Sequence, residues 1–407
     1  MTGSHGSKRS ELRDHWCVIL GSFLGLSVGV TSTIGYSHGA LIAPLEADFG
    51  WSRAALSLGL TFYAIAILVT GPWWGALADR LGARVVATAS LILYAVGMLS
   101  VPAGIHHMPF WLLYFLVSCL GAGSGAVTLI KPVADSFAAA RGIAIGIAFA
   151  SIGLSAFWVP RLAVWLTALG GWSLVFKTFA VLALLGAPLL WFLLPGRPLT
   201  READQLKPSD SEGIMLGEAV RTTTFWMLMA IGLLLTIGLI GLGTHLIPMF
   251  HEAGASMADA AATASMLGLS SLAGRLLVGT LLDRLNGRLV ALAVSLMAMS
   301  GIIILCTATG SASLTLVGVL LMGFAFGSEM DMIAYFASRY FGRRAFGAIY
   351  GWLGGVIAMG GGIGSLIAGA THDWSGDYQA AMLICAVLTG LAALLALRLG
   401  PYRYVPH

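Results

Sequence analysis

One arginine lies deep within an apolar stretch of the sequence. Arg275 falls inside the stretch 260–282, eight residues before Asp283, which is about 12 Å at the rise of an α-helix. A guanidinium at that depth in hydrocarbon is costly unless it faces water or a partner. Its planar fork of donors fits a carboxylate through two parallel hydrogen bonds. Arg275 is therefore a candidate for binding an organic anion; the alternative is an arginine paired within the protein for packing or gating.

Three titratable side chains in later apolar stretches are candidates for carrying a proton. Glu329 and Asp331 lie in one stretch, and a carboxyl group in an apolar setting can bind and release a proton. Glu329 is the first choice. The alternative is that both acids pair with Arg339 or Arg343 at the end of that stretch. His245 titrates near neutral pH as a free side chain, although such a histidine is more often a satisfied core residue.

A lysine in the first half of the chain has two interpretations. Lys131 precedes Pro132 and lies one turn before Asp135. In the first interpretation its side chain snorkels to the membrane surface. In the second it reaches the binding site and gives an anion a second positive group, which would suit a dicarboxylate.

Other patterns with possible chemistry indicate packing instead. Four cysteines lie in or at the ends of different apolar stretches, and no two form a CxxC pair, so neither a disulfide framework nor a metal cluster is predicted. The glycine-rich runs GAGSGA from 121 and GGVIAMGGGIG from 354 lack the GKS or GKT ending of a phosphate loop and favour close helix packing. We therefore expect no metal, no cofactor, no nucleic-acid partner and no enzymatic activity.

The elements that position these residues are apolar throughout. Of the 407 residues, 58% are hydrophobic and 10% are charged, against roughly 25% charged residues in soluble domains. Twelve stretches of about 20 residues or more can each cross about 30 Å of hydrocarbon as a helix, and they lack the period-2 alternation of a barrel. The sequence predicts an all-α membrane protein with spans at 16–43, 52–76, 84–104, 110–133, 142–163, 172–194, 223–249, 260–282, 288–309, 312–337, 345–370 and 378–398.

The distribution of basic residues predicts the orientation of these spans. One side of the predicted topology carries seventeen of the 22 Lys and Arg residues, in both tails and in the loops after even-numbered spans, whereas the other side carries only Arg53, Arg161 and Lys177. Lys and Arg concentrate in cytoplasmic loops. We therefore expect a multi-pass protein of the inner (plasma) membrane with both termini in the cytoplasm.

A polar segment divides the spans into two sets of six. It holds five acidic residues, several basic ones, Pro198 and Pro208. The predicted organisation is a cytoplasmic N-terminal tail at 1–15, a first bundle at 16–194, a cytoplasmic linker at 195–222, a second bundle at 223–398 and a cytoplasmic tail at 399–407.

The two sets share a loop motif after their second span. GALADRLGAR at 75–84 and GTLLDRLNGR at 279–288 have Gly, Asp, Arg and a closing Arg at the same spacing, offset by 204 residues. Duplication explains this agreement. We interpret the motif as a conformational latch, in which the glycines allow close helix approach and the charges make contacts in one conformation only; the alternative is ordinary loop charge. The predicted latch residues are Gly75, Asp79, Arg80, Arg84, Gly279, Asp283, Arg284 and Arg288.

The duplicated motif and the six-plus-six spans resemble the major facilitator superfamily over essentially the whole chain. That resemblance implies a major facilitator fold of twelve transmembrane helices in two pseudo-symmetric six-helix bundles, alternating access around a site near the midplane, and a monomer.

Four further segments resemble the branch of monocarboxylate transporters and oxalate/formate antiporters. They are FGWSRAALS from 49, SFAAARGIAIG from 136, LAGRLLVGTLLDR from 272 and RYFGRRAFGAIYG from 339. In that branch an arginine at the position of Arg275 binds the substrate carboxylate.

Two departures from that branch limit what the resemblance implies about protons. The acid one turn before the arginine is replaced by Ser271, and the proton-linked lysine of the first helix is absent. The nearest polar candidates in the first span are Tyr36 and His38. The leading hypothesis is a secondary transporter for a small organic anion, a carboxylate, coupled to the proton. The alternative keeps the fold but exports hydrophobic or cationic compounds, with Glu329 and Asp331 as counter-charges.

Overall fold

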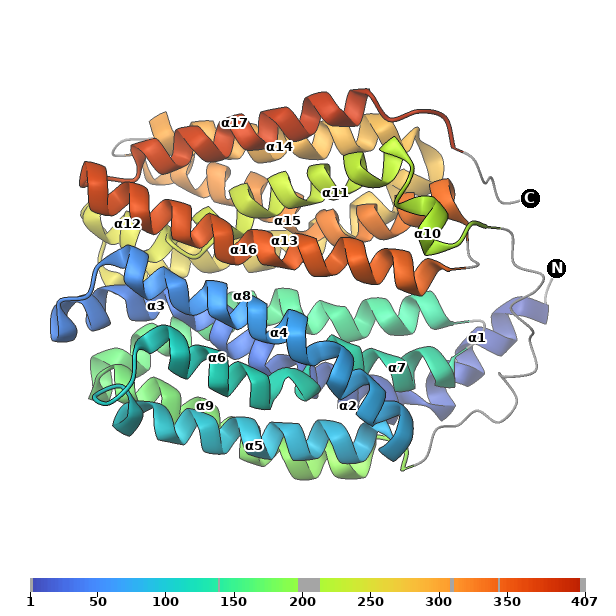
Figure 1. Ribbon diagram of the computed structural model, residues 1–407, viewed down its shortest axis with the longest axis horizontal. Coiled ribbons are helices and arrows are strands. Elements are labelled where there is room, and N and C mark those ends of the chain that lie inside the picture. Colours follow the sequence, from blue (N-terminus) through green and yellow to red (C-terminus); the bar gives the residue numbers. More distant parts are fainter. Residues whose placement is uncertain (1–2, 138–139, 197–212, 308–310, 343–344, 403–407) are drawn as a thin grey trace. The chain divides into compact units, whose positions relative to one another are not determined.

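The computed structural model describes residues 3–137, 140–196, 213–307, 311–342 and 345–402. Within these ranges the chain is built from helices, shown in Figure 1. They are α1 (Gly3–Asp14), α2 (Trp16–Val28), α3 (Val30–Phe49), α4 (Arg53–Leu81), α5 (Ala83–Gly104), α6 (Phe110–Gly121), η1 (Ala122–Ser124), α7 (Ala126–Ser136), α8 (Arg141–Gly170), α9 (Trp172–Leu193), α10 (Leu216–Ala219), α11 (Thr223–Thr236), η4 (Ile237–Gly241), α12 (Leu246–Glu252), α13 (Met257–Arg284), α14 (Gly287–Thr307), α15 (Ala312–Phe341), α16 (Phe346–Ser375) and α17 (Gln379–Leu397).

These helices supply twelve segments that are long and apolar enough to cross a membrane. The predicted all-α membrane fold is confirmed. Several spans run past their predicted ends: the first reaches Phe49 and the fifth reaches Gly170. The sequence underestimated them because polar residues such as Glu46 end an apolar stretch but continue a helix at the membrane surface. The seventh span is shorter than predicted and ends at Gly241, the last residue of the π-helical turn η4.

The first and fourth spans are interrupted rather than continuous. The first breaks at Gly29, whose backbone is extended between α2 and α3, and the fourth breaks at Gly125 after the short 3₁₀ turn η1. Backbone groups freed inside a membrane need internal partners. Ser32 donates its hydroxyl to Leu26 O at 2.6 Å, and Thr33 donates to Gly29 O at 2.9 Å. Side chains of α3 therefore satisfy the carbonyls that the break in α2 releases.

The chain forms two compact units. Unit 1 comprises residues 1–48 and 65–206, and unit 2 comprises 49–64 and 207–407. The first turns of α4 thus belong to unit 2, although the helix continues into unit 1. In unit 1, α2 packs on α8 and α5 on α9; in unit 2, α13 packs on α15 and α14 on α15 and α17. The division into bundles at 16–194 and 223–398 remains a prediction.

The polar N-terminal segment is helical and is anchored to unit 1. Glu11 of α1 accepts a hydrogen bond from the backbone N–H of Ala140, at 2.9 Å, where α8 begins. Leu12 packs against a buried cluster that includes Val18 and Phe137. The residues predicted as a tail therefore hold the start of α8.

The outer surfaces of the helices carry large apolar side chains. Trp73, Phe192 and Leu276 each have more than 70% of their surface exposed. Exposed apolar surface of this extent on twelve long helices suits contact with lipid chains and not with water. The chain is a multi-pass membrane protein.

Candidate functional site

The candidate site forms where α13 and α15 approach each other closely in unit 2. A Cβ atom on Gly327 of α15 would overlap the carbonyl oxygen of Ser271, and one on Gly274 of α13 would overlap that of Phe324. Small residues permit such backbone contact between membrane helices. The two helices therefore lie near enough for side chains following these glycines to meet across the contact.

Arg275 meets Asp331 across this contact. Its Nη1 atom donates to Asp331 Oδ1 at 3.1 Å. The Arg275 side chain is 20% exposed and that of Asp331 is 35% exposed. A charged pair that is shielded but still reachable can exchange one partner for another ion of the same sign. The sequence found both residues but not their pairing, because they lie 56 positions apart.

Glu329 lies two residues before Asp331 on α15 and meets a different helix. Successive helical residues are 100° apart, so these two side chains point to nearly opposite sides of α15. Glu329 is 2% exposed and accepts a hydrogen bond from the hydroxyl of Thr236 at the end of α11. The π-helical turn η4 follows Thr236 directly, and π turns inside helices often occur at functional sites.

The alternative in which both acids pair with Arg339 is not observed among the described residues. Asp331 pairs with Arg275 and Glu329 with Thr236. The guanidinium of Arg339 instead lies 5.0 Å from the ring centroid of Tyr335, and Arg343 lies outside the described residues.

Tyr350 of α16 lies within electrostatic range of the site. The side chain interacts electrostatically with Asp331, Arg275 and Glu329. This tyrosine lies in the segment RYFGRRAFGAIYG from 339, which resembles the monocarboxylate branch. The sequence does mark Tyr350 as a possible site residue, because its hydroxyl lies within an apolar span. Nothing in the sequence indicates which helices face it.

The other predicted substrate contacts belong to unit 1. Tyr36 and Lys131 are half-buried there, on α3 and α7. His38 is 1% exposed, and its ring lies 5.7 Å from that of Tyr114 and 6.2 Å from that of Phe110. His38 is thus enclosed by aromatic side chains of α6. The roles of these residues as substrate contacts remain predictions.

His245 lies just before α12 and is fully buried in unit 2. Its Nδ1 atom is 3.0 Å from the Tyr378 hydroxyl, and its Nε2 atom is 3.1 Å from both Ser57 Oγ and the Ser365 carbonyl oxygen. None of these three partners belongs to the site formed by α13 and α15. His245 therefore belongs to a second polar cluster.

The two copies of the loop motif differ in their surroundings. A Cβ atom on Gly75 would come within 2.9 Å of Val127, whereas one on Gly279 would meet no described atom within 4 Å. Among the described residues, no helix approaches Gly279 closely. Arg84 Nε donates to Leu194 O at 2.6 Å and the Arg84 guanidinium lies 5.8 Å from the Trp191 ring centroid.

The remaining latch residues give less information. Arg80 and Arg284 are exposed, and Arg288 is half-buried. The side chains of Asp79 and Asp283 lie outside what the structure describes. The interpretation of the motif as a latch stays a prediction.

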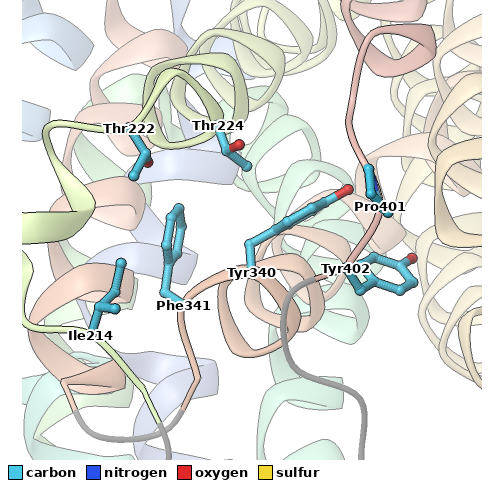
Figure 2. A pocket seen from close by; sticks show the side chains of 7 residues that line it. All are labelled: Ile214, Thr222, Thr224, Tyr340, Phe341, Pro401 and Tyr402. Carbon is cyan, nitrogen blue, oxygen red and sulfur yellow. The ribbon is translucent and has the colours of Figure 1, made fainter.

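A pocket of about 370 Å³ lies at one end of unit 2, beside the C-terminal segment. Figure 2 shows that the rings of Tyr340, Phe341 and Tyr402 border it. The other lining residues are Ile214, Thr222, Thr224 and Pro401. None of these lining residues is charged, although the guanidinium of Arg339 lies 5.8 Å from the ring centroid of Tyr402.

Twelve spans, interrupted helices and a partly exposed ion pair between two of the spans are typical of a membrane transporter. Residues 23–356 match the Major Facilitator Superfamily, and the chain belongs to that family. Proteins of this family are transporters and not enzymes.

Comparison with individual proteins extends this result. The gallate transporter of Pseudomonas putida is 26% identical over 87% of this chain and 84% of its own. Monocarboxylate transporter 13 of Bos taurus is 25% identical over 94% and 89% of the two chains, and the probable nitrate/nitrite transporter NarK2 of Mycobacterium tuberculosis is 26% identical over 89% and 92%. The crystal structure of a D-xylose–proton symporter matches with a TM-score of 0.73 at 17% identity, covering 97% of this chain and 98% of that chain. This structural match shows the fold alone.

Proposed function

We propose that this protein is a secondary transporter that moves a small organic anion, a carboxylate, together with a proton across the inner membrane by alternating access. The observation that carries the proposal is the partly exposed ion pair between Arg275 and Asp331. The relatives named for gallate, monocarboxylates and nitrate/nitrite support an anion as the cargo.

Substrate binding follows from the geometry of the pair. A substrate carboxylate presents the same two oxygen acceptors as the side chain of Asp331, and a guanidinium binds either of them through parallel N–H donors. The substrate therefore takes the place of Asp331 on Arg275. Tyr350 is near enough to act on both charges, so its hydroxyl is a candidate donor to the second substrate oxygen.

Proton coupling follows from charge balance at the same pair. If the substrate displaced Asp331 while this residue was still a carboxylate, an unpaired negative charge would remain within the spans. Such a charge costs free energy. Protonation of Asp331 removes this charge and releases Arg275 for the anion. One proton then enters with one monoanion, and the site keeps the same net charge before and after loading. In this scheme Asp331 replaces Glu329 as the first choice for the proton carrier.

The proposed orientation rests on the basic residues. Seventeen of 22 lie on the side that carries both termini, and we assign that side to the cytoplasm. Fusion of a periplasm-active reporter to the C-terminus tests this assignment: no reporter activity is expected, and activity would reverse the topology.

The function is tested by uptake into proteoliposomes. A panel of radiolabelled mono- and dicarboxylates and nitrate is offered with and without an inward proton gradient. We expect gradient-stimulated uptake of a carboxylate by the unmodified protein and at least tenfold less by Arg275→Gln. Asp331→Asn is expected to bind the anion but to lose the stimulation, because its side chain carries no exchangeable proton.

Matched variants separate these effects from general damage. Lys177→Gln removes an exposed positive charge from α9, and Asp259→Asn removes an exposed negative charge from α13; both should retain coupled uptake. Full uptake of a carboxylate by Arg275→Gln would refute the role of Arg275. No uptake of any anion, together with resistance to cationic or hydrophobic drugs in an exporter-deficient host, would favour the exporter alternative.

A further inference from the structure

A second group of titratable side chains gathers in unit 2 and shares no residue with the Arg275 site. We call it the Arg53 cluster. It joins four elements: the first turn of α4, both ends of α12, the last turn of α16 and the residue before α17. Its members are Arg53, His245, Glu252, His372, Asp373 and Tyr378.

Asp373 caps the start of α4 from another helix. The backbone N–H groups of Arg53 and Ala54 donate to its two carboxylate oxygens at 3.0 and 2.8 Å. The first N–H groups of a helix have no partner within the helix and carry partial positive charge. Asp373 satisfies two of these donors from a position 320 residues away, so the end of α16 fixes the beginning of α4.

The side chain of Arg53 extends this attachment to two more elements. The guanidinium is 7% exposed and forms an ion pair with Glu252 at the end of α12. Its Nη1 atom also donates to the Tyr378 hydroxyl at 2.7 Å. A nearly buried guanidinium needs such partners, and separating α4 from them would leave a buried charge unpaired.

His372 lies between the two carboxylates of the cluster. Its Nε2 atom is 3.2 Å from Glu252 Oε1, and its Nδ1 atom is 4.0 Å from Asp373 Oδ1. With a neutral imidazole the cluster holds two negative charges and one positive charge. A proton on His372 balances them, and the side chain is only 12% exposed, so this balance is weakly screened by water.

His245 is not the group that takes this proton. Both of its ring nitrogens already have partners, in Tyr378 on one side and Ser57 and Ser365 on the other. Its ring also lies within electrostatic range of the positive charge of Arg53. The groups that face His372 are Glu252 from α12, Asp373 from its own helix and Tyr378 before α17. Arg53 and His372 both act electrostatically on His245.

We propose that the Arg53 cluster is a second proton site, in which a proton on His372 locks the start of α4 onto α12 and α16. Acidification tightens the lock by adding this proton, because the imidazole then carries a positive charge between Glu252 and Asp373. Loss of the proton at higher pH leaves one excess negative charge, which loosens the lock. Alternating access requires the ends of the spans to separate and rejoin, so this site makes one step of that cycle sensitive to pH. The inference does not depend on the identity of the substrate.

The test measures how often the start of α4 opens. Leu56 is fully buried just after the capped turn, and Leu56→Cys is introduced into full-length protein whose four native cysteines are replaced by alanine. Labelling by a maleimide in detergent or liposomes is followed at pH 5.5 and pH 8. At each pH we take the ratio of two labelling rates: the rate of the protein carrying His372→Gln over the rate of the protein with His372. This ratio cancels the intrinsic pH dependence of the thiol.

We expect this ratio to be close to one at pH 8 and about three- to tenfold at pH 5.5, because only the imidazole gains a charge on acidification. His251→Gln is the matched control: His251 is exposed on α12, bonded to the Ala255 carbonyl oxygen, and its ratio should stay at one. Glu252→Gln keeps the proposal testable if His372→Gln does not fold: it removes the carboxylate that lies 3.2 Å from His372, and it should raise labelling at pH 5.5 more than at pH 8. A ratio that is equal at the two pH values, or that falls on acidification, overturns the proposal.

Discussion

Removing the charges of Arg275 and Asp331 together is expected to harm stability less than the two single changes predict. The atoms are 3.1 Å apart, so the gross attraction is about 5 kcal/mol at an effective dielectric constant of about 20. Most of this attraction offsets the cost of taking both groups out of water. With both side chains partly exposed, we expect a net coupling of about 1–2 kcal/mol, between the ranges of surface and buried pairs.

The assay is a double-mutant cycle on the free energy of unfolding. Arg275→Gln, Asp331→Asn and the double variant are titrated with SDS in mixed micelles, and unfolding is followed by circular dichroism and tryptophan fluorescence. Each single change leaves its partner without a counter-ion, whereas the double change leaves none, so the effects should be less than additive. The combination of Asp331→Asn with Lys177→Gln, which joins residues of different units, should be additive. A coupling of less than about 0.3 kcal/mol, within the usual error of additivity, would refute the pairing.

Three further changes test other parts of the structure. Gly327→Ala places a methyl group against the Ser271 carbonyl and should cost about 1–3 kcal/mol, whereas Gly351→Ala, which has open space, should stabilise α16 slightly; equal unfolding midpoints would contradict the close packing. Asp373→Ala removes the cap of α4 and should cost about 0.5–2 kcal/mol, seen as faster hydrogen exchange of the first α4 amides, and unchanged exchange would exclude the cap. Tyr350→Phe should raise KM for the transported anion by about tenfold to a hundredfold without lowering the maximal rate, because a hydrogen bond to a charged group contributes about 1.5–3 kcal/mol; an unchanged KM would remove the hydroxyl from the site.

The sequence reveals the residues of the site but not their partners. Arg275 stands out because a charge inside an apolar span is rare and costly, and that signal is local. Its pairing with Asp331 depends on the crossing of α13 and α15, which glycines from both helices allow. A one-dimensional pattern shows that such glycines favour packing, but it does not indicate which helix each one meets.

The Arg53 cluster shows the same limit more strongly. Its charged members lie at positions 53, 252, 372 and 373, and each one looks like an ordinary charge at a helix end. Only the folded chain brings the N-terminal turn of α4 to the carboxylate of Asp373, 320 residues away. Helix ends carry unsatisfied groups wherever they occur, so their partners are selected by the tertiary structure.

The pattern of apolar residues alone identifies the lipid bilayer as the solvent and an all-helical membrane protein as the class of fold. Twelve long apolar stretches leave a chain no stable arrangement except helices in a membrane, because each backbone group must be satisfied within its own span. The repeated loop motif and the positions of its charges likewise point to a duplicated transporter. The tertiary structure decided where spans break, as at Gly29 and Gly125, and which charges pair. Those outcomes depend on contacts between helices far apart in the chain, and hydropathy carries no information about which helices meet.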